Sequence, residues 1–340
     1  MMVREYLKLA RSFNAVLTGV SPVMGAIAMK QYDILILFLL FLIGFFGHTY
    51  GFVLNDIIDF KLDKSSKEIS DRPLISGTIS IKKAWIFAIM TMVIAFAISF
   101  FIGYRFHSYY PILILAVSAF FITIYNLMSK KYPFMDIFVA LGIFFLILFG
   151  AFYGENPSKS LNEITRLAWI VCILGAIQVM FMQTIAGGMK DIENDFKRGA
   201  KTLAIGMGVR VDDKKLKVSL SFKGLAYGLQ MLDMIVVFLP FFIVWNVRNL
   251  TVLQYFQWAV IIFIGLIMFL LSNKLLSMKR FDRSKARKYI GSHYMINFAI
   301  VPIMLMSLNT WAGILLFFPG LGFILSNIIL HGTIAQPKTM

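Results

Sequence analysis

The chain has 340 residues, of which 59% are hydrophobic and 15% charged, and its mean hydropathy is +0.79. A soluble domain of this length cannot bury so much apolar surface, so the composition excludes a soluble globular protein and indicates an integral membrane protein. The formal net charge of +16 is accompanied by no stacking motif or fold typical of nucleic-acid binding, so we expect no nucleic-acid partner.

The N-terminal segment MMVREYLKLARSFN is basic and amphipathic and has no small-residue cleavage site. It therefore predicts no removable signal peptide. An amphipathic segment of this kind is also typical of a short helix that lies along the membrane interface.

Apolar runs of roughly 17–25 residues follow, the helix length that crosses a ~30 Å hydrocarbon core. We place ten of them, at 13–30, 33–54, 84–104, 109–128, 133–153, 167–189, 222–246, 252–273, 290–307 and 311–331. Only a short Asn-Thr turn separates the last two, which leaves open a re-entrant or broken helix there. The predicted fold is an all-α, polytopic transmembrane helical bundle of nine or ten spans, in one domain over 1–340.

The second run ends in NDIIDFKLD, the first acidic cluster. If the helix continues through it, Asn55, Asp59 and Asp63 follow at i, i+4 and i+8, and Asp56 lies three residues before Asp59. Like charges on one stripe repel, so the arrangement is unfavourable unless a cation lies between the carboxylates.

The sixth run ends in KDIEND, the second acidic cluster, with Asp191 and Asp195 at i and i+4. Ten of the 17 acidic residues of the chain fall in the two loops that these clusters open. Each cluster is followed by a basic, glycine-containing segment, and this weak echo is typical of a duplication. A duplication would bring two equivalent helix ends to opposite walls of one cavity.

Carboxylate and amide oxygens without His or Cys favour a hard cation, and Mg²⁺ commonly takes one or two carboxylates plus phosphate oxygens. Basic residues near both clusters would neutralise a departing diphosphate. They are Arg72, Lys130, Lys131, Lys190, Lys197, Arg198 and Lys201. An isoprenoid tail would gain ~0.8 kcal/mol per CH₂ buried in the membrane. The pattern therefore predicts a Mg²⁺ site for an isoprenoid diphosphate.

Charge placement predicts the orientation. If Lys223 and Lys30, at the ends of runs seven and one, are counted with the adjacent loops, the N-terminus and the loops after runs two, four, six and eight hold 27 Lys and Arg residues, against five in the loops between them. Because basic loops stay on the cytoplasmic side, we expect the N-terminus and both acidic clusters to be cytoplasmic. The basic run KRFDRSKARK at 279–288 is interpreted as a topology determinant that binds anionic lipid.

Two polar residues inside apolar runs have alternative interpretations. Asp233 lies within the seventh run, where an ionisable group is costly: it contacts an acceptor or cavity, or it is protonated or paired between helices. His48 shares a helix face with the first cluster, two turns deeper. An interhelical hydrogen bond is the favoured interpretation, with an acceptor contact as the alternative.

The segments NDIIDFKLDK with RPLISG, YNLMSKK at 125–131 and KDIENDFKRGAKTL at 190–203 resemble the UbiA superfamily of intramembrane prenyltransferases. The marks of that superfamily are an NDxxDxxxD motif and a second DxxxD motif. The resemblance runs from about Arg11 to about Gly208. It implies an all-α bundle, usually of nine helices, around a central cavity. Two departures are Ser12, where a proline is common, and ten apolar runs rather than nine.

The resemblance also implies roles for individual residues. It implies that the aspartates hold Mg²⁺ and, through it, the diphosphate of a polyprenyl donor: Asp56, Asp59, Asp63, Asp191 and Asp195. Together with the basic residues nearby, it predicts a diphosphate-binding set of Asn14, Asn55, Arg72, Tyr125, Lys130 and Lys190. We assign the catalytic role to Asp59, Asp191 and Asp195, and Asp191 is also a candidate to orient or deprotonate the acceptor.

The predicted function is Mg²⁺-dependent transfer of a polyprenyl group to a lipophilic acceptor in the membrane, with release of diphosphate. An aromatic quinone precursor is the favoured acceptor, and a prenylglycerol phosphate, as in ether-lipid synthesis, is the runner-up. A secondary transporter is a more distant alternative, since its ionisable groups usually lie near mid-bilayer. A non-catalytic lipid-binding protein would explain acidic loops in general, but not two clusters that each lie on one stripe.

Overall fold

The computed structural model describes residues 2–64, 70–129 and 131–332, without the side chains of Phe13, Leu62, Asp63, Arg198 and Pro319. The all-α prediction is confirmed, apart from one small hairpin of strands β1 (Arg210–Asp212) and β2 (Lys215–Lys217). The α-helices are α1 (Met2–Leu9), α2 (Ser12–Ala28), α3 (Ile34–Ile58), α4 (Phe60–Asp63), α5 (Ile81–Phe106), α6 (Tyr110–Met128), α7 (Asp136–Ala151), α8 (Arg166–Met180), α9 (Gly188–Arg198), α10 (Leu203–Gly206), α11 (Leu220–Ile243), α12 (Val252–Leu276), α13 (Arg283–Leu305) and α14 (Phe317–His331). Shorter segments are the 3₁₀ turns η2 (Leu161–Glu163), η4 (Val247–Asn249) and η5 (Thr310–Leu316), and the π-helix η3 (Phe181–Gly187).

Every predicted apolar run lies largely within helix. In the described part of the chain, seven helical stretches are long and apolar enough to cross a membrane: Ile34–Ile58, Ile81–Phe106, Tyr110–Met128, Arg166–Lys197, Leu220–Ile243, Val252–Leu276 and Thr310–His331. The apolar helices Asn14–Ala28 and Asp136–Ala151 are shorter, and α13 begins with the polar sequence RSKARK. The chain is a multi-pass membrane protein. A bundle of nine or ten spans and its orientation stay predictions.

The chain divides into two compact units, which are described separately. Unit 1 comprises Met1–Leu127, Phe145–Ala168 and Phe317–Met340, and unit 2 comprises Met128–Phe144 and Trp169–Leu316. Helices α7 and α8 each supply residues to both units. The assignment of 1–340 to a single domain stays a prediction.

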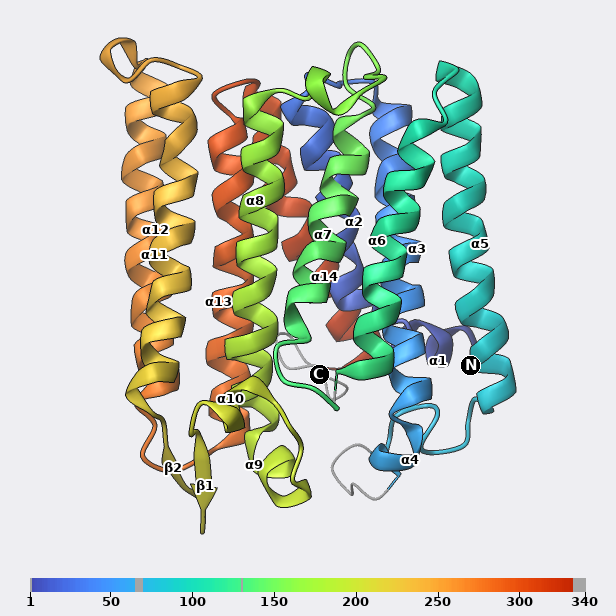
Figure 1. Ribbon diagram of the computed structural model, residues 1–340, viewed down its shortest axis with the longest axis vertical. Helices are drawn as coiled ribbons and strands as arrows, with labels where there is room; N and C mark the ends of the chain where they lie inside the picture. The colour runs from blue at the N-terminus through green and yellow to red at the C-terminus, as the bar shows by residue number, and fades with distance from the viewer. Residues whose placement is uncertain (1, 65–69, 130, 333–340) are drawn as a thin grey trace. The chain divides into compact units, whose positions relative to one another are not determined.

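In unit 1, α3 packs against both α2 and α5, and the helices run lengthwise beside one another (Figure 1). Glycines allow the backbones to approach closely. A Cβ at Gly44 of α3 would lie 2.6 Å from the Thr18 carbonyl oxygen of α2. At Gly25 and Gly150 an added Cβ would clash with the backbone of Ile147 and Pro22, so α2 and the end of α7 are in backbone contact.

In unit 2, α12 packs against α11 and α13, and Figure 1 shows α11 and α12 as a neighbouring pair. Buried polar side chains join these helices. The Gln230 amide lies 2.7 Å from both Ser272 Oγ and His293 Nε2. The β1–β2 turn has positive φ at Asp213 and Lys214, as a two-residue hairpin requires.

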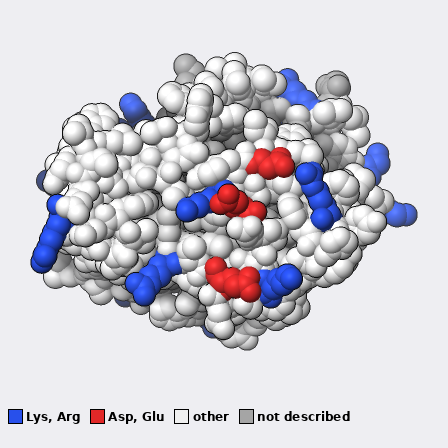
Figure 2. All heavy atoms as spheres, turned by 90° about the horizontal axis from the view of Figure 1, so that it is seen from above, with Lys and Arg blue, Asp and Glu red and all other residues white. Residues whose placement is uncertain are grey.

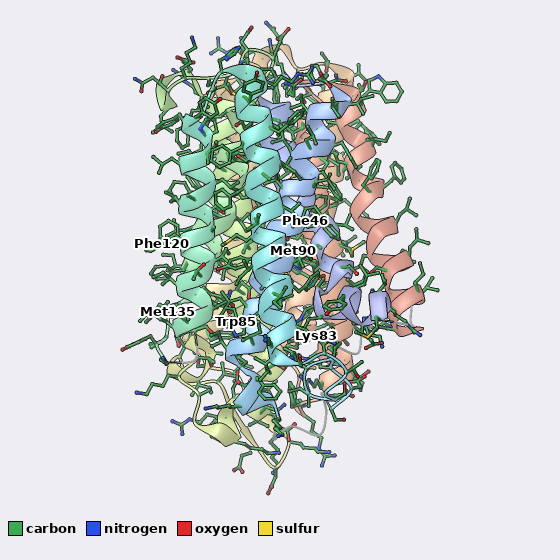
Figure 3. The ribbon with its side chains drawn as sticks, turned by 90° about the vertical axis from the view of Figure 1, so that its right-hand side faces the viewer. Phe46, Lys83, Trp85, Met90, Phe120 and Met135 are labelled. Atoms are coloured by element: carbon green, nitrogen blue, oxygen red, sulfur yellow. The ribbon has the colours of Figure 1, made fainter. Side chains whose placement is uncertain are left out.

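The outer faces of the unit 1 helices are apolar. Trp85 and Met90 of α5 and Phe120 of α6 are exposed, and Figure 3 labels them along the sides of these helices. Figure 2 shows the molecule from the end at which α5 passes into α6, where most of the surface is uncharged. A long apolar side with sparse charge at one end is the surface that a bilayer accommodates.

Candidate functional site

The first acidic cluster lies at the end of α3. The helix ends at Ile58, Asp59 is its C-cap, and the N–H of Asp59 donates to the Asn55 carbonyl oxygen at 2.9 Å. The predicted four-residue spacing therefore holds from Asn55 to Asp59. It is interrupted there, because the short helix α4 carries Asp63, whose side chain lies outside the described set.

Asp56 is buried and forms ion pairs with two arginines. Arg11 Nη2 donates to Asp56 Oδ1 at 2.7 Å, and Arg72 Nη1 lies 3.6 Å from the same oxygen. Arg11 has φ +46° at the junction of α1 and α2, and its guanidinium lies 4.8 Å from the ring centroid of Phe52. This backbone turn and cation–π contact aim the guanidinium at Asp56.

The loop that carries Arg72 is anchored by its own sequence, RPLISG. Leu74 and Ile79 are buried in a core formed with α1, α3 and α5. The Ser76 N–H donates to the Arg72 carbonyl oxygen at 2.9 Å, and Gly77 has φ +76°, a conformation that favours glycine. The loop is therefore fixed on both sides of its turn, which holds Arg72 beside Asp56.

The second acidic cluster lies on α9, which continues from α8 through the π-helical segment η3. Asp191 and Asp195 are one turn apart on α9, as predicted. Gly199 ends this helix with φ +65°, and the Ala200 N–H donates to the Asp195 carbonyl oxygen at 3.0 Å. Thr202 then caps α10. The sequence KDIENDFKRGAKTL thus encodes a helix, a glycine stop and a new helix start.

Asp191 forms two ion pairs. Lys190 Nζ lies 3.4 Å from its Oδ2, and Arg283 Nη2 donates to its Oδ1 at 2.6 Å. Burial and then the neighbouring Arg287 lower the pKa of Arg283 to about 10, so its guanidinium stays charged at neutral pH. Arg283 lies in the run that the sequence assigned only to topology and lipid binding, so its contact with Asp191 was missed.

The hairpin explains how Arg283 reaches this position. The Phe281 N–H donates to the Lys214 carbonyl oxygen at 2.7 Å, and the Leu216 N–H donates to the Lys279 carbonyl oxygen at 3.0 Å. The segment before α13 thus pairs with β2 through an antiparallel bridge between Lys215 and Arg280, while β1 packs against α9. No local sequence pattern predicts this long-range pairing.

The remaining predicted residues are distributed as follows. Asp59 is buried, while Tyr125 on α6 and Asp195 on α9 are half-buried. Asn14 lies on α2, and its Oδ1 is buried. Lys130 lies outside the described residues. Within unit 1 the structure brings Asp56 and Arg72 together, and within unit 2 it brings Lys190 and Asp191 together.

The two residues with alternative interpretations are both buried. His48 Nδ1 lies 2.8 Å from Thr18 Oγ1 of α2, so the predicted interhelical hydrogen bond is confirmed. Asp233 lies on α11 in unit 2, beside Gln178 of α8. This position agrees with an interhelical role, and its contact with an acceptor stays a prediction.

The residues of the two clusters fit a hard divalent cation by their chemistry, since their ligating atoms are all oxygens. In the described ranges no group of three or more His, Cys, Asp or Glu lies close enough to hold a metal. Each of Asp56 and Asp191 instead lies against arginine. Mg²⁺ needs only one or two carboxylates when phosphate and water complete its shell, so the donor set fits an ion that binds with an anionic ligand.

The sequence matches the UbiA prenyltransferase family over residues 16–299. It is 28% identical to the digeranylgeranylglyceryl phosphate synthase of Saccharolobus solfataricus over 257 residues, which cover 74% of this chain and 83% of that protein. It is also 28% identical to the 4-hydroxybenzoate octaprenyltransferase of Vibrio atlanticus over 194 residues, 55% of this chain and 61% of that protein.

Two solved structures share the fold. A structure reported for digeranylgeranylglyceryl phosphate synthase aligns with a TM-score of 0.63 and 23% identity, covering 92% of this chain and 99% of that chain. A UbiA homologue from Archaeoglobus fulgidus bound to GPP and Mg²⁺ aligns with a TM-score of 0.60 and 16% identity, covering 87% and 99%. At these identities the likeness establishes the fold.

Proposed function

Since the chain belongs to the UbiA prenyltransferase family, we propose that it transfers a polyprenyl group from a polyprenyl diphosphate to a lipophilic acceptor in the membrane and releases diphosphate. The observation that carries the proposal is that each acidic cluster holds a carboxylate in contact with basic side chains, Asp56 with Arg11 and Arg72, and Asp191 with Lys190 and Arg283. Paired acidic and basic groups of this kind suit a ligand that is itself a metal–diphosphate complex.

The metal in this proposal is Mg²⁺, supported by the Archaeoglobus fulgidus homologue, which was solved with GPP and Mg²⁺. Its ligands in this chain would be Asp56, Asp59, Asp63, Asp191 and Asp195. When bound, the ion would neutralise charge on the diphosphate as the allylic C–O bond breaks. Asn14, Asn55, Tyr125 and Lys130 are proposed to contact the same diphosphate.

The basic side chains would act on the leaving group. Arg11 and Arg72 are held in place by Asp56, and Lys190 and Arg283 by Asp191. With a cation on the aspartates, these donors would be free to face the developing negative charge, where prearranged positive groups are most effective. Asp191 is also proposed to orient the acceptor. The apolar helix faces would exclude water from the carbocation-like centre.

We favour a prenylglycerol phosphate as the acceptor, the route that the sequence alone ranks second. The Saccharolobus solfataricus relative, which is similar over most of this chain, is a digeranylgeranylglyceryl phosphate synthase. An aromatic quinone precursor is the second candidate, because the Vibrio atlanticus 4-hydroxybenzoate octaprenyltransferase is equally identical over a shorter length. We also propose that the site faces the cytoplasm, because the loops that carry the two acidic clusters are rich in Lys and Arg.

The test is prenyl transfer by purified protein in liposomes with Mg²⁺. Geranylgeranyl diphosphate is supplied with either geranylgeranylglyceryl phosphate or 4-hydroxybenzoate, and products are identified by mass. We expect a diether product, which disappears with EDTA and returns with added Mg²⁺. Prenylation of 4-hydroxybenzoate alone would select the second candidate. Ion flux without consumption of the diphosphate would overturn the proposal in favour of a transporter.

A further inference from the structure

Polar side chains continue from Asp56 into the apolar interior of unit 1, between α2 and α3. On α3, His48, Phe52 and Asp56 follow at four-residue intervals and therefore share one face. The antiparallel α2 supplies the other side. We call this group the α2–α3 seam, and its members are Arg11, Asn14, Thr18, His48, Phe52 and Asp56.

The seam is a continuous chain of contacts. Arg11 donates to Asp56 at 2.7 Å, and its guanidinium lies 4.8 Å from the ring centroid of Phe52. The Phe52 ring stacks on His48 with centroids 4.2 Å apart and an interplanar angle of 27°. His48 Nδ1 then lies 2.8 Å from Thr18 Oγ1. The imidazole is therefore fixed on one face and at one ring nitrogen.

The other ring nitrogen has no such contact. Among the residues that the structure describes, His48 Nε2 and Asn14 Oδ1 are buried atoms of the seam without a hydrogen-bond partner. Leaving a buried polar group unpaired is destabilising, and most buried polar groups are paired. Two such atoms beside a candidate substrate site indicate that the seam is complementary to a polar ligand.

Open space lies at Gly47, the residue that precedes His48 on α3. A Cβ placed on Gly47 would meet no atom within 4 Å, whereas one at Gly44 would lie 2.6 Å from the Thr18 carbonyl oxygen. One side of α3 is thus closed by α2 and the side at Gly47 is not. Among the described residues, α3 therefore has room for a ligand group or a lipid chain at Gly47, about 100° around the helix from His48.

His48 lies eight residues before Asp56, which is ~12 Å along the helix axis. It is therefore on the apolar side of Asp56, where the prenyl chain of a donor held at Asp56 must run. An acceptor hydroxyl that attacks the allylic carbon has to approach from this apolar side, since the diphosphate occupies the other.

Building on the proposed function, we propose that His48 Nε2 binds the nucleophilic hydroxyl group of the acceptor and takes its proton. This role requires the tautomer in which Nδ1–H donates to Thr18 Oγ1, which leaves a lone pair on Nε2. The hydroxyl oxygen forms a bond to the allylic carbon, the allylic C–O bond breaks, and diphosphate leaves with the electron pair. The hydroxyl proton passes to Nε2, and Thr18 is a positioning residue that fixes the tautomer.

The test compares His48→Gln, His48→Phe and Thr18→Val with the wild type, using geranylgeranyl diphosphate and geranylgeranylglyceryl phosphate in liposomes. Glutamine still binds a hydroxyl but does not take its proton. We therefore expect kcat to fall about a hundredfold in His48→Gln, with the acceptor KM within about threefold. His48→Phe should also raise the acceptor KM, and Thr18→Val should lower kcat about tenfold.

The matched control is Tyr50→Phe, which removes a 2.8 Å contact between Tyr50 and Thr123 on another face of α3. It should leave kcat and both KM values unchanged. Mg²⁺-dependent binding of geranylgeranyl diphosphate, measured by calorimetry, should stay at the wild-type affinity in every His48 variant. This binding measurement separates a defect in acceptor chemistry from a defect in the donor site.

A His48→Gln protein with the wild-type kcat would overturn the inference and leave the proposed function intact, as would loss of donor binding in that variant. This variant decides the question even if His48→Phe does not fold. A wild-type protein that binds the donor but prenylates neither acceptor would contradict the proposed function, and the inference with it.

Discussion

The two acidic clusters differ in how far they are removed from water. The Asp56 side chain is 8% exposed and lies against Arg11 and Arg72, whose side chains are 10% and 12% exposed. The Asp191 side chain is 36% exposed and pairs with Lys190 and Arg283, each 18% exposed. An aspartate with two basic side chains thus forms a buried ion triad in unit 1 and a half-exposed one in unit 2.

This difference separates structural and chemical roles. Removing one partner of a buried ion pair leaves an uncompensated charge, whereas water compensates much of the loss at an exposed pair. We therefore expect the Asp56 triad to contribute to folding as well as to chemistry. The Asp191 triad is expected to contribute chiefly to chemistry, because its carboxylate is already accessible.

The largest expected difference between the two clusters is the loss of stability when the aspartate is removed. Asp56→Leu removes the carboxylate that lies against two buried guanidinium groups and should lower the free energy of unfolding by about 3–5 kcal/mol. Asp191→Leu should lower it by about 1 kcal/mol or less. Equilibrium unfolding in mixed detergent micelles without Mg²⁺ measures both. Equal losses would show that burial does not separate the clusters.

Activity should depend on both clusters. Asp59→Ala and Asp191→Ala should each reduce prenyl transfer at least about a hundredfold, because each removes a charge from the diphosphate site. Glu193→Ala is the control, since Glu193 lies on α9 beside Asp191 but pairs with the exposed Lys197 at 2.8 Å. Wild-type turnover by either aspartate variant would remove that residue from the site.

A double-mutant cycle compares the arginine contacts directly. The coupling free energy between Arg11→Met and Asp56→Asn should be about 2–3 kcal/mol, and that between Arg283→Met and Asp191→Asn about 1 kcal/mol or less. Methionine retains an apolar stem, so lost packing contributes little. Both cycles are measured on unfolding without Mg²⁺, and the reverse order of couplings would contradict the comparison.

The last test concerns the two glycines that shape the flanking loops, whose effect is local to each turn. Gly77→Ala and Gly199→Ala should each cost about 1–2 kcal/mol, because φ is +76° and +65°. No atom lies within 4 Å of either Cβ position, so the cost is conformational. Gly47→Ala, at a helical glycine that also has open space, is the control and should be neutral or slightly stabilising. A neutral Gly77→Ala would show that the turn relaxes.

The sequence predicts features that depend on neighbours along the chain. Apolar runs predict the helices, and the four-residue spacings place Asn55 with Asp59 and Asp191 with Asp195. It also predicts the His48 hydrogen bond between helices, though not Thr18 as the partner. The sequence does not predict contacts between side chains that only tertiary folding brings together.

Arg283 is the clearest such case, because it meets Asp191 only after the segment before α13 joins β2. Arg11 is another, since its aim depends on a left-handed backbone turn at a residue that is not glycine. The sequence also does not predict that α3 ends before Asp59, because a helix that continues to Asp63 fits the same four-residue spacing. In each case the deciding term is tertiary packing, for which residue periodicity carries no signal.

The backbone contact of α2 with the end of α7 at Gly25 and Gly150 has a mechanical consequence. Two helices separated by side chains can slide or roll as rotamers adjust, but two backbones in direct contact have no such freedom. Helix α2 and the end of α7 should therefore move together as one rigid body. Any opening in unit 1 that admits a lipid has to be made by helices with side chains at their interfaces.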